Sequence, residues 1–286
     1  ADSGNYNLTL SSLTASNNVA TITKADLKVI GANTVTTYNG GVQTNTFTLE
    51  GIKGSDTVTS VVGLASQTHY SASAYQDELS DAQGTGLSNY TISYQNGSLT
   101  IGKADLKVIG ANTVTTYNGG VQTNTFTLEG IKGSDTVTSV VGLASQTHYS
   151  ASAYQDELSD AQGTGLSNYT ISYQNGSLTI GKASYTALNG TKTYDGNANF
   201  ASATLTGVNG EQFTVSDLVA DSANASANNG ASKFIDYTGS ITGLNGADSG
   251  NYNLTLSSLT GSNNVATITK ADLKVIGAST VTTYNG

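Results

Sequence analysis

The chain has 286 residues, a formal net charge of -9, and 11 lysines without a single arginine. Phosphate recognition depends on a basic stripe and on arginine forks, so we predict no nucleic acid partner. The sequence has no cysteine, which excludes disulfides and thiolate metal sites, and no apolar run long enough to cross a bilayer, so we predict no membrane insertion.

Internal repetition organises the chain. The segment 24–102 recurs without a change at 103–181, and we call these two copies type A repeats. A divergent third unit, the type B repeat, occupies 182–269. Self-similarity at a fixed period is typical of arrays in which neighbouring repeats support one another. We therefore predict three complete repeat domains in tandem.

The two ends of the chain are also related to each other. Residues 1–40 match 247–286 at all but two positions. Segment 1–23 therefore corresponds to the closing part of a type B repeat, and 270–286 to the opening part of a type A repeat. We expect the chain to be a window from a longer array.

Each type A repeat contains six or seven short segments with the alternation of β-strands. Apolar side chains alternate with polar ones around Leu27, Phe47 and Tyr90, and these segments are rich in β-branched and aromatic residues. An Asn96-Gly97 pair separates the segments 90–95 and 98–102, which predicts a β-hairpin. The predicted fold is all-β: a tandem array of small antiparallel β-sandwich domains of Ig-like type.

Two further segments bear on the architecture. The stretch Ala74–Ala82 has the composition for one or two helical turns, which leaves β-grasp-like α+β modules as the alternative fold. The junction Gly102–Asp105 between the first two repeats has no proline-rich or glycine/serine-rich linker. Such a short junction limits the swing between domains, so we predict that the array behaves as a rod.

A recurring pattern opens and closes each repeat. Every repeat starts at Lys-Ala, reaches a Tyr-Asn-Gly or Tyr-Asp-Gly triplet, and closes with an Asn-Tyr strand before the next Lys-Ala. The motif residues are Tyr38, Asn39 and Gly40; Tyr117, Asn118 and Gly119; and Tyr194, Asp195 and Gly196. This pattern resembles the YDG and MBG repeat families of very large bacterial surface adhesins and filamentous-haemagglutinin-like exoproteins.

The resemblance covers essentially the whole chain. The unit 182–269 fits the YDG pattern best, whereas Asn39 and Asn118 replace the aspartate in the type A repeats. It implies extracellular stalk modules that are poor in cysteine and lie at the bacterial cell surface. It also makes 1–23 the C-terminal part of a truncated YDG-type domain. The family offers no catalytic residues, and we predict neither enzymatic activity nor a cofactor.

Each type A repeat contains an acidic cluster that could offer ligands to a metal ion. Carboxylates offer the oxygen ligands that Ca²⁺ prefers, but these lack the one-three-five spacing, the fixed glycine and the terminal glutamate of a calcium-binding loop. We favour a solvated acidic loop and predict no metal centre. The residues are Asp77, Glu78 and Asp81, repeated as Asp156, Glu157 and Asp160.

Histidine and tyrosine are the remaining candidates for chemistry. His69 and its copy His148 have no nucleophile at a recognisable spacing, so we interpret them as structural or surface residues. The rings of Tyr38, Tyr70 and Tyr75 offer a face for stacking on sugars, although packing within the fold is the favoured interpretation.

The sequence therefore favours a structural role. We predict a stalk or fibre segment of a repetitive extracellular adhesin, at the cell surface or in a biofilm matrix, in which copy number sets length. Its expected partners are neighbouring repeats or further copies in a filament. The alternative is a multivalent module that binds host or matrix glycans, with avidity from the repeated sites.

Overall fold

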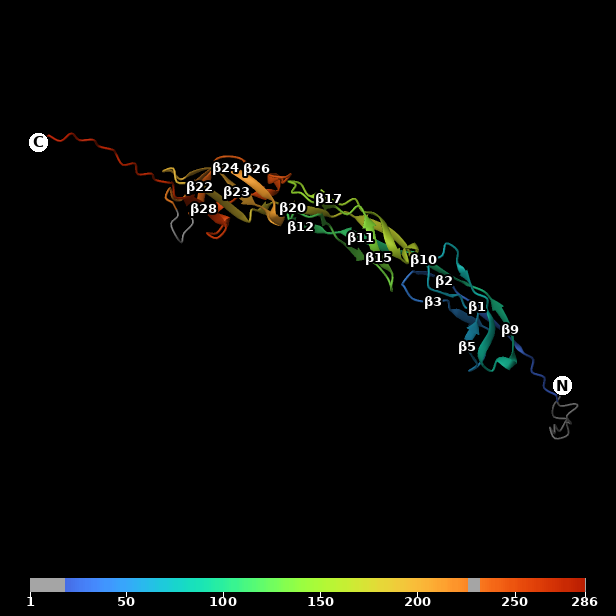
Figure 1. The fold of residues 1–286 in the computed structure, drawn as a ribbon. Coiled ribbons are helices and arrows are strands. Elements are labelled where there is room, and N and C mark those ends of the chain that lie inside the picture. The colour runs from blue at the N-terminus through green and yellow to red at the C-terminus, as the bar shows by residue number, and fades with distance from the viewer. Residues whose placement is uncertain (1–18, 226–231, 286) are drawn as a thin grey trace, which may run out of the picture. The chain divides into compact units, whose positions relative to one another are not determined.

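The computed structural model describes residues 19–225 and 232–285, and its regular structure is almost entirely β-strand (Figure 1). The all-β prediction is confirmed. No helix among the described residues has the length and apolar character needed to cross a membrane. The described helical segments are 3₁₀ turns of three residues: η3 (Leu87–Asn89), η4 (Leu166–Asn168), η5 (Val208–Gly210), η6 (Ser249–Asn251) and η7 (Leu256–Ser258).

The first repeat folds into two three-stranded sheets, β4-β1-β9 and β2-β10-β7, with two smaller pairs, β3-β6 and β5-β8. Strand β1 pairs in parallel with β9, and β2 in parallel with β10, so the sheets are mixed where purely antiparallel ones were predicted. The strands are β1 (Ala25–Gly31), β2 (Asn33–Thr37), β3 (Gln43–Thr44), β4 (Phe47–Glu50), β5 (Thr57–Val62), β6 (Ser66–Gln67), β7 (Tyr75–Gln76), β8 (Ser80–Thr85), β9 (Tyr90–Gln95) and β10 (Ser98–Gly102).

The predicted hairpin at Asn96-Gly97 is wrong. Strands β9 and β10 lie in different sheets, and Asn96-Gly97 connects them. This connection lies beside the one between β1 and β2, which also crosses from one sheet to the other. Gly97 lacks the positive φ of a tight hairpin turn. A Cβ at Gly97 would collide with the main-chain carbonyls of Gly31 and Ala32. Glycine is needed here because two crossing segments approach each other closely.

A buried carboxylate holds this crossing together. Asp77 is 1% exposed, and its Oδ2 accepts hydrogen bonds from the Gly97 amide at 3.1 Å and from Asn45 Nδ2 at 2.8 Å. Its Oδ1 accepts from the Ala65 amide at 2.8 Å. Several donors to one carboxylate make this burial tolerable.

These bonds also explain why Ala74–Ala82 is not helical. The segment contains β7, an irregular stretch that carries Asp77, and the start of β8. The tertiary bonds of Asp77 outweigh the local preference for a helical turn, so the helical prediction and the alternative α+β fold are wrong. Asp77 was also expected in a solvated loop, and it is instead a structural residue.

The second repeat has the same strands one period later. Strand β12 pairs in parallel with β20, β17 lies on the other side of β20, and β13 pairs with β16. Asp156 accepts from the Gly176 amide, Asn124 and the Ala144 amide as Asp77 does in the first repeat. The strands are β11 (Ala104–Gly110), β12 (Asn112–Thr116), β13 (Gln122–Thr123), β14 (Phe126–Glu129), β15 (Thr136–Val141), β16 (Ser145–Gln146), β17 (Tyr154–Gln155), β18 (Ser159–Thr164), β19 (Tyr169–Gln174) and β20 (Ser177–Gly181).

The third repeat is built on a larger sheet, with the order β25-β24-β23-β22-β28 and β26 also paired to β24 (Figure 1). Strand β22 runs parallel to β28, and β21 parallel to β27. Its core contains Phe213, Phe234 and Leu188, all fully buried. The strands are β21 (Ala183–Ser184), β22 (Ala187–Thr193), β23 (Asn199–Thr206), β24 (Gln212–Ala220), β25 (Phe234–Tyr237), β26 (Ile241–Gly243), β27 (Tyr252–Asn253) and β28 (Asn264–Thr269).

Tertiary contacts group the chain into two compact units, and their border lies inside the second repeat. The first unit contains the first repeat and the adjoining part of the second repeat. The second unit contains the rest of the second repeat and the third repeat. The described residues after Thr269 form no strand and are exposed. The first unit is the chain up to Lys107 with Glu129–Ser139 and Gln162–Ser172, and the second is Val108–Leu128, Val140–Ala161 and the chain from Tyr173.

Candidate functional site: the junctions between repeats

The three motif tyrosines occupy one structural position. Each follows the strand that runs parallel to the last strand of its repeat, so both strands end at the same side. The tyrosine amide donates to the last carbonyl of that final strand: Tyr38 to Gly102 at 2.9 Å, Tyr117 to Gly181 at 2.8 Å, and Tyr194 to Thr269 at 2.8 Å. The motif therefore lies where the chain leaves the repeat, and we call this side the motif face.

The side opposite the motif face begins the repeat. Here the first strand starts beside the tyrosine of the closing Asn-Tyr pair, as in the parallel register of Ala25 with Tyr90 and of Ala183 with Tyr252. A carboxylate from a nearby loop accepts a hydrogen bond from that tyrosine hydroxyl, as Asp56 does from Tyr90 at 2.9 Å. We call this side the receiving face.

In the first compact unit, Tyr38 joins the two faces. Its side chain is 4% exposed, and its hydroxyl donates to Asp135 Oδ2 of the next repeat at 2.7 Å. The same oxygen accepts from the Tyr169 hydroxyl at 2.8 Å. The Tyr38 ring lies edge-on to Tyr169, with centroids 5.4 Å apart, and stacks on His69 at 6.4 Å. The junction thus combines aromatic packing with charge-assisted hydrogen bonds.

A second set of bonds is contributed by the loop at His69. The Tyr70 amide donates to Asn168 Oδ1 at 3.0 Å, and Asn168 Nδ2 lies 3.3 Å from His69 Nδ1. The amide oxygen of Asn168 accepts from the Tyr70 amide, and its nitrogen faces the His69 ring. Asn168 is 2% exposed as a result.

The glycine of the motif lets the backbones meet. Gly40 has φ +83°, and a Cβ there would lie 2.6 Å from the Gly133 nitrogen of the next repeat. Both the left-handed conformation and the contact require glycine. Gly119 has φ +79°, and a Cβ there would meet the side-chain amide of Asn209 in the third repeat rather than its backbone.

The second compact unit repeats the arrangement with a different partner sequence. Tyr117 donates to Glu211 Oε1 at 2.7 Å, and its ring lies edge-on to Tyr252 at 5.3 Å. The Tyr252 hydroxyl donates to the other oxygen of Glu211. The Tyr149 amide donates to Asn251 Oδ1 at 2.9 Å. A glutamate therefore replaces the aspartate, and the rest of the geometry is retained.

The apolar core of this unit is continuous across the second junction. Leu178 and Ile180, from the final strand of the second repeat, belong to the same buried cluster as Leu188 and Phe213 of the third. Tyr117 is part of that cluster, at 4% exposure. Burying this much apolar surface makes the junction part of the fold rather than a linker.

The surroundings of the junction tyrosines raise their pKa values. Burial raises the pKa of Tyr117 to about 12, and the hydrogen bond to Glu211 adds to the effect. Burial, followed by the bond to Asp135, raises the pKa of Tyr169 to about 12. For Tyr38 the bond to Asp135 is the first cause of a raised pKa. The phenols therefore act as neutral hydrogen-bond donors to the carboxylates.

The third motif is open. Tyr194 is 45% exposed, and no described residue lies within 4 Å of a Cβ placed on Gly196. The turn itself is the same: Asp195 Oδ1 accepts from the Asn197 amide at 3.2 Å, just as Asn39 Oδ1 accepts from the Gly41 amide at 2.9 Å. Because both side chains cap the turn with an oxygen, Asn and Asp are interchangeable in the motif.

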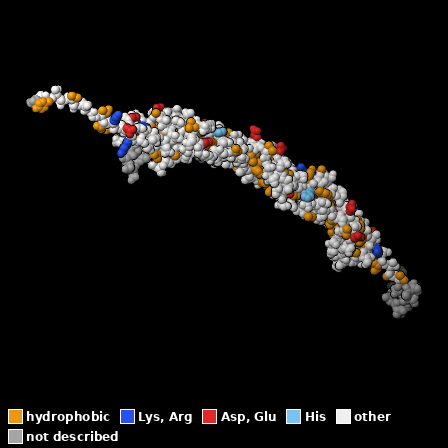
Figure 2. Space-filling model, in the orientation of Figure 1, with side chains coloured by type: hydrophobic (Ala, Val, Ile, Leu, Met, Phe, Trp, Pro, Cys, Tyr) orange, Lys and Arg blue, Asp and Glu red, His pale blue; other side chains and the backbone are white. Residues whose placement is uncertain are grey.

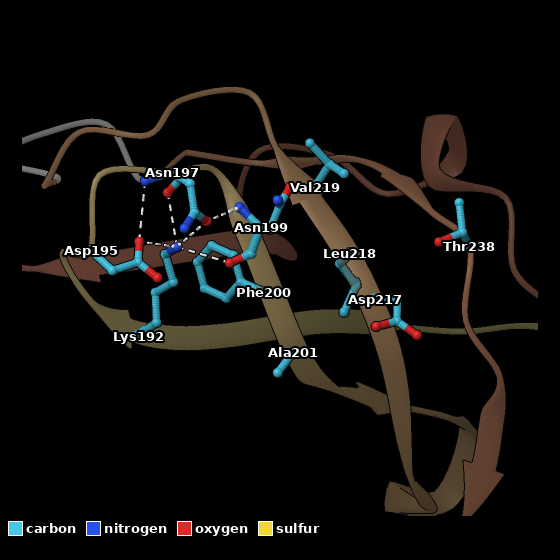
Figure 3. Close-up of a pocket in the computed structure, with 10 residues that line it drawn as sticks. All are labelled: Lys192, Asp195, Asn197, Asn199, Phe200, Ala201, Asp217, Leu218, Val219 and Thr238. Atoms are coloured by element: carbon cyan, nitrogen blue, oxygen red, sulfur yellow. Dashed lines mark hydrogen bonds and ion pairs between the residues drawn. The ribbon is translucent and has the colours of Figure 1, made fainter.

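A lysine is packed against this third turn (Figure 3). The Lys192 ammonium donates to Asp195 Oδ1 at 2.7 Å and to the carbonyls of Asn197 and Asn199, each at 2.8 Å, and it lies 5.3 Å from the Phe200 ring centroid. The hydrogen bond from Lys192 is the largest cause that lowers the pKa of Asp195. The adjacent pocket of about 660 Å³ is shallow and lacks a nucleophile with an oriented base.

The other residues singled out in the sequence are dispersed or already engaged. Asp77 is bound within the fold, and the described residues contain no group of three His, Asp or Glu side chains placed to hold a metal ion. Tyr38 is buried in a junction and cannot stack on a sugar. The Tyr75 hydroxyl donates to the His69 carbonyl at 3.0 Å, and Lys103 covers the Tyr70 ring at 5.0 Å.

Searches with the chain found no matching protein-family model, no matching curated protein and no matching solved structure. Sequence reasoning found the motif triplet but missed its partners Asp135 and Glu211, and it missed the role of His69. The Asn-Tyr pair that closes every repeat, type B included, was the available signal for the receiving face.

Proposed function

We propose that the chain is a stalk segment of a repetitive bacterial extracellular adhesin, in which tyrosine junctions fix each repeat to the next. The observation that carries this proposal is the burial of Tyr38 and Tyr117, each with its hydroxyl bonded to a carboxylate of the following repeat. In such a segment the number of repeats sets the reach, and the junctions set the stiffness.

Three further features support a mechanical role. The junction occurs twice with two different partner sequences, so its geometry is retained while residues change. In the first two repeats, the motif tyrosine and glycine contact the following repeat. The visible surface is dominated by uncharged polar side chains and backbone, with scattered charges, as suits a spacer rather than a charge-selective binding surface (Figure 2).

The test measures how firmly the first junction is held. Because the chain has no cysteine, Ser60→Cys and Ser139→Cys provide unique positions for a pair of spin labels. Both residues are exposed and lie on opposite sides of the first junction within one compact unit. We expect a narrow distance distribution for the labelled chain. Tyr38→Ala removes the ring and its hydrogen bond, and the width of the distribution should at least double.

Tyr194→Ala is the matched control, since it makes the same substitution at the same motif position, where the described residues include no contacting repeat. It should leave the distribution unchanged. A distribution that is already broad with Tyr38 in place, or one that Tyr38→Ala does not alter, would contradict the stalk proposal. Circular dichroism of each variant separates a loosened junction from an unfolded repeat.

A further inference from the structure

The motif turns of the two type A repeats share one side-chain arrangement. Asn39 and Asn118 are exposed, and each lies between the buried motif tyrosine and the motif glycine. The Asn39 Oδ1 accepts a hydrogen bond from the Gly41 amide at 2.9 Å, and the Asn118 Oδ1 accepts from the Gly120 amide at the same distance. The two turns have the same sequence, so any difference in their chemistry must come from their neighbours.

An Asn-Gly pair contains both an electrophile and a nucleophile. The side-chain amide of Asn39 offers its Cγ, and the main-chain nitrogen of Gly40 lies next to it along the chain. Glycine has no side chain to obstruct the approach of this nitrogen. When the nitrogen adds to Cγ, negative charge develops on Oδ1, to which the Gly41 amide already donates. A donor placed where charge develops lowers the barrier to the reaction.

We propose that Asn39 is a site of self-modification, at which the Asn39-Gly40 pair closes into a succinimide and then opens to aspartate or isoaspartate. The Gly40 nitrogen gives its proton to water and bonds to Asn39 Cγ. The bond from Cγ to Nδ2 breaks, and Nδ2 takes up a proton and leaves as ammonia. Water then cleaves one of the two carbonyl bonds of the ring nitrogen and returns a proton to it. The net change is one water consumed and one ammonia released.

The two turns differ in what holds the peptide bond between asparagine and glycine, which must rotate for the ring to close. At the second turn, the Asn118 carbonyl accepts from Asn209 Nδ2 at 2.7 Å, and a Cβ on Gly119 would lie 2.4 Å from the same nitrogen. At the first turn, neither the Asn39 carbonyl nor the Gly40 amide has a hydrogen-bond partner among the described residues. Folding therefore restrains Asn118 and leaves Asn39 able to react.

A second Asn-Gly pair in each type A repeat is protected by the fold. The Asn96 Oδ1 accepts from the Leu79 amide at 2.9 Å, and the Gly97 amide donates to Asp77 at 3.1 Å. Gly97 is also buried where the two segments cross. Both reacting groups are therefore held in place, and the same dipeptide serves as an internal control.

The two products differ in their consequence for the first junction. An aspartate retains the turn, since Asp195 caps the same turn in the third repeat. An isoaspartate routes the main chain through the side chain and adds one atom to the backbone just before Gly40, which packs against Gly133 of the next repeat. The added length displaces the turn from this contact. This consequence rests on the proposed function of the junction, whereas the reaction itself does not.

The experiment ages the intact 286-residue chain at mildly alkaline pH and follows each asparagine by peptide mass spectrometry. Conversion of an amide to an acid adds about 1 Da. Cleavage after lysine gives identical peptides 29–53 and 108–132 from the two type A repeats, so Thr48→Ser marks the first copy by its mass. Thr48 is an exposed residue of β4 outside the turn. A parallel sample in urea gives the rate of each site in the unfolded chain.

The folded and unfolded rates should rank the sites. Asn39 should convert in the folded chain at least as fast as in urea, because the Gly41 donor is in place and the peptide bond is not held. Asn118 and Asn96 should convert about tenfold more slowly than in urea, since each depends on local opening. An Asn39 that folding slows tenfold, or an Asn118 that reacts as fast as Asn39, would overturn the inference.

Removing the contact at the second turn gives a matched test. Asn209→Gly deletes the side chain that holds the Asn118 carbonyl, and glycine suits the φ of +52° at this position. The conversion of Asn118 should become about tenfold faster and match that of Asn39, whose own rate should not change. An unchanged rate at Asn118 in a variant that circular dichroism shows to be folded would contradict the inference.

The spin-label pair at Ser60→Cys and Ser139→Cys measures the effect on the junction. Ageing should broaden the distance distribution as isoaspartate accumulates, whereas Asn39→Asp, which encodes the other product, should leave it narrow. A distribution that stays narrow despite isoaspartate at Asn39 would overturn the stated consequence. A chain in which Asn39 does not react, while the junction still depends on Tyr38, would overturn this inference and leave the stalk proposal intact.

Discussion

The receiving faces of the first two repeats have the same sequence and different surroundings. In the second repeat, Asn168 is 2% exposed and Asp135 accepts hydrogen bonds from Tyr38 and Tyr169. In the first repeat, Asn89 is exposed and Asp56 accepts from Tyr90. Yet Tyr90 and Tyr169 are both buried, and both donate to their loop carboxylate.

Comparing the two faces shows which contacts a repeat makes within itself and which contacts the preceding repeat adds. The bond between tyrosine and carboxylate belongs to the repeat, so the receiving face is organised before it is occupied. The burial of the asparagine and the second phenol belong to the junction. A preorganised face of this kind lowers the entropic cost of ordering side chains on docking.

Alkaline pH should have the largest effect, because it acts on several junction tyrosines at once. The pKa of Tyr117 and Tyr169 is raised to about 12 in the folded chain, above about 10 for an unfolded tyrosine. Their contribution to stability is therefore complete below pH 10 and is lost as the pH rises through 12. We expect the junctions to open over this interval. Tyrosinate absorbance should show one fewer late-titrating group in Tyr169→Phe.

Substitution of the motif glycine should come next. Gly40→Ala imposes a left-handed alanine and a collision with Gly133, which we expect to cost roughly 2–4 kcal/mol. Gly196→Ala has the same backbone strain without a neighbour, and should cost roughly 1–2 kcal/mol. Urea unfolding of both variants measures the difference. Equal losses would show that Gly40 does not contact the next repeat in solution.

The junction carboxylate should have an intermediate effect. Asp135→Ala removes the acceptor of two phenols, whereas Asp56→Ala removes the acceptor of one. A hydrogen bond to a charged group contributes roughly 1.5–3 kcal/mol, so Asp135→Ala should destabilise the chain by about that much more than Asp56→Ala. The midpoints of urea unfolding provide the comparison. If Asp56→Ala proves equally harmful, the Tyr38 bond contributes nothing.

The asparagine pair offers the smallest and most local test. Asn168→Ala leaves the Tyr70 amide without its acceptor, at a cost of roughly 1–2 kcal/mol, while Asn89 is exposed and its removal should be neutral. Hydrogen exchange at the Tyr70 amide should accelerate about tenfold in Asn168→Ala. It should not change in Asn89→Ala. Unchanged exchange in both variants would place Tyr70 outside the junction.

Much of the local structure could be predicted from the sequence. The alternation around Leu27 and Phe47 matches β1 and β4, since one face of β1 is buried and one face of β4 is half-buried. Among the described residues the helical segments are 3₁₀ turns of three residues, which agrees with the abundance of Thr, Ser, Asn and Gly. The exact repetition required that both type A copies adopt the same strands, as they do.

The pairing of the strands could not be predicted. Asn96-Gly97 has the composition of a hairpin turn, but parallel pairing of β1 with β9 and of β2 with β10 requires both segments to cross between sheets. Contacts between residues far apart in the sequence decide the strand pairing, such as the hydrogen bonds of Asp77 with Asn45 and Gly97. An acidic residue in a polar stretch gives no local sign that it will be buried.

One side of the junction, the motif, could be recognised in the sequence, and the residues that it contacts could not. The motif glycine and tyrosine stand out because they recur, but the partners of Tyr38 lie in the following repeat, near Asp135 and Asn168. In a tandem array a residue conserved between copies can serve its neighbour rather than its own repeat. Only the fold shows which side of the repeat each residue occupies.

The parallel pairing of the second and last strands has an evolutionary corollary. It places the tyrosine turn where the chain leaves the repeat. Each repeat therefore has the receiving face where it begins and the motif face where it ends. An in-frame duplication of one block therefore creates a new joint that already fits, and a lineage can lengthen the molecule by recombination without first altering a single side chain.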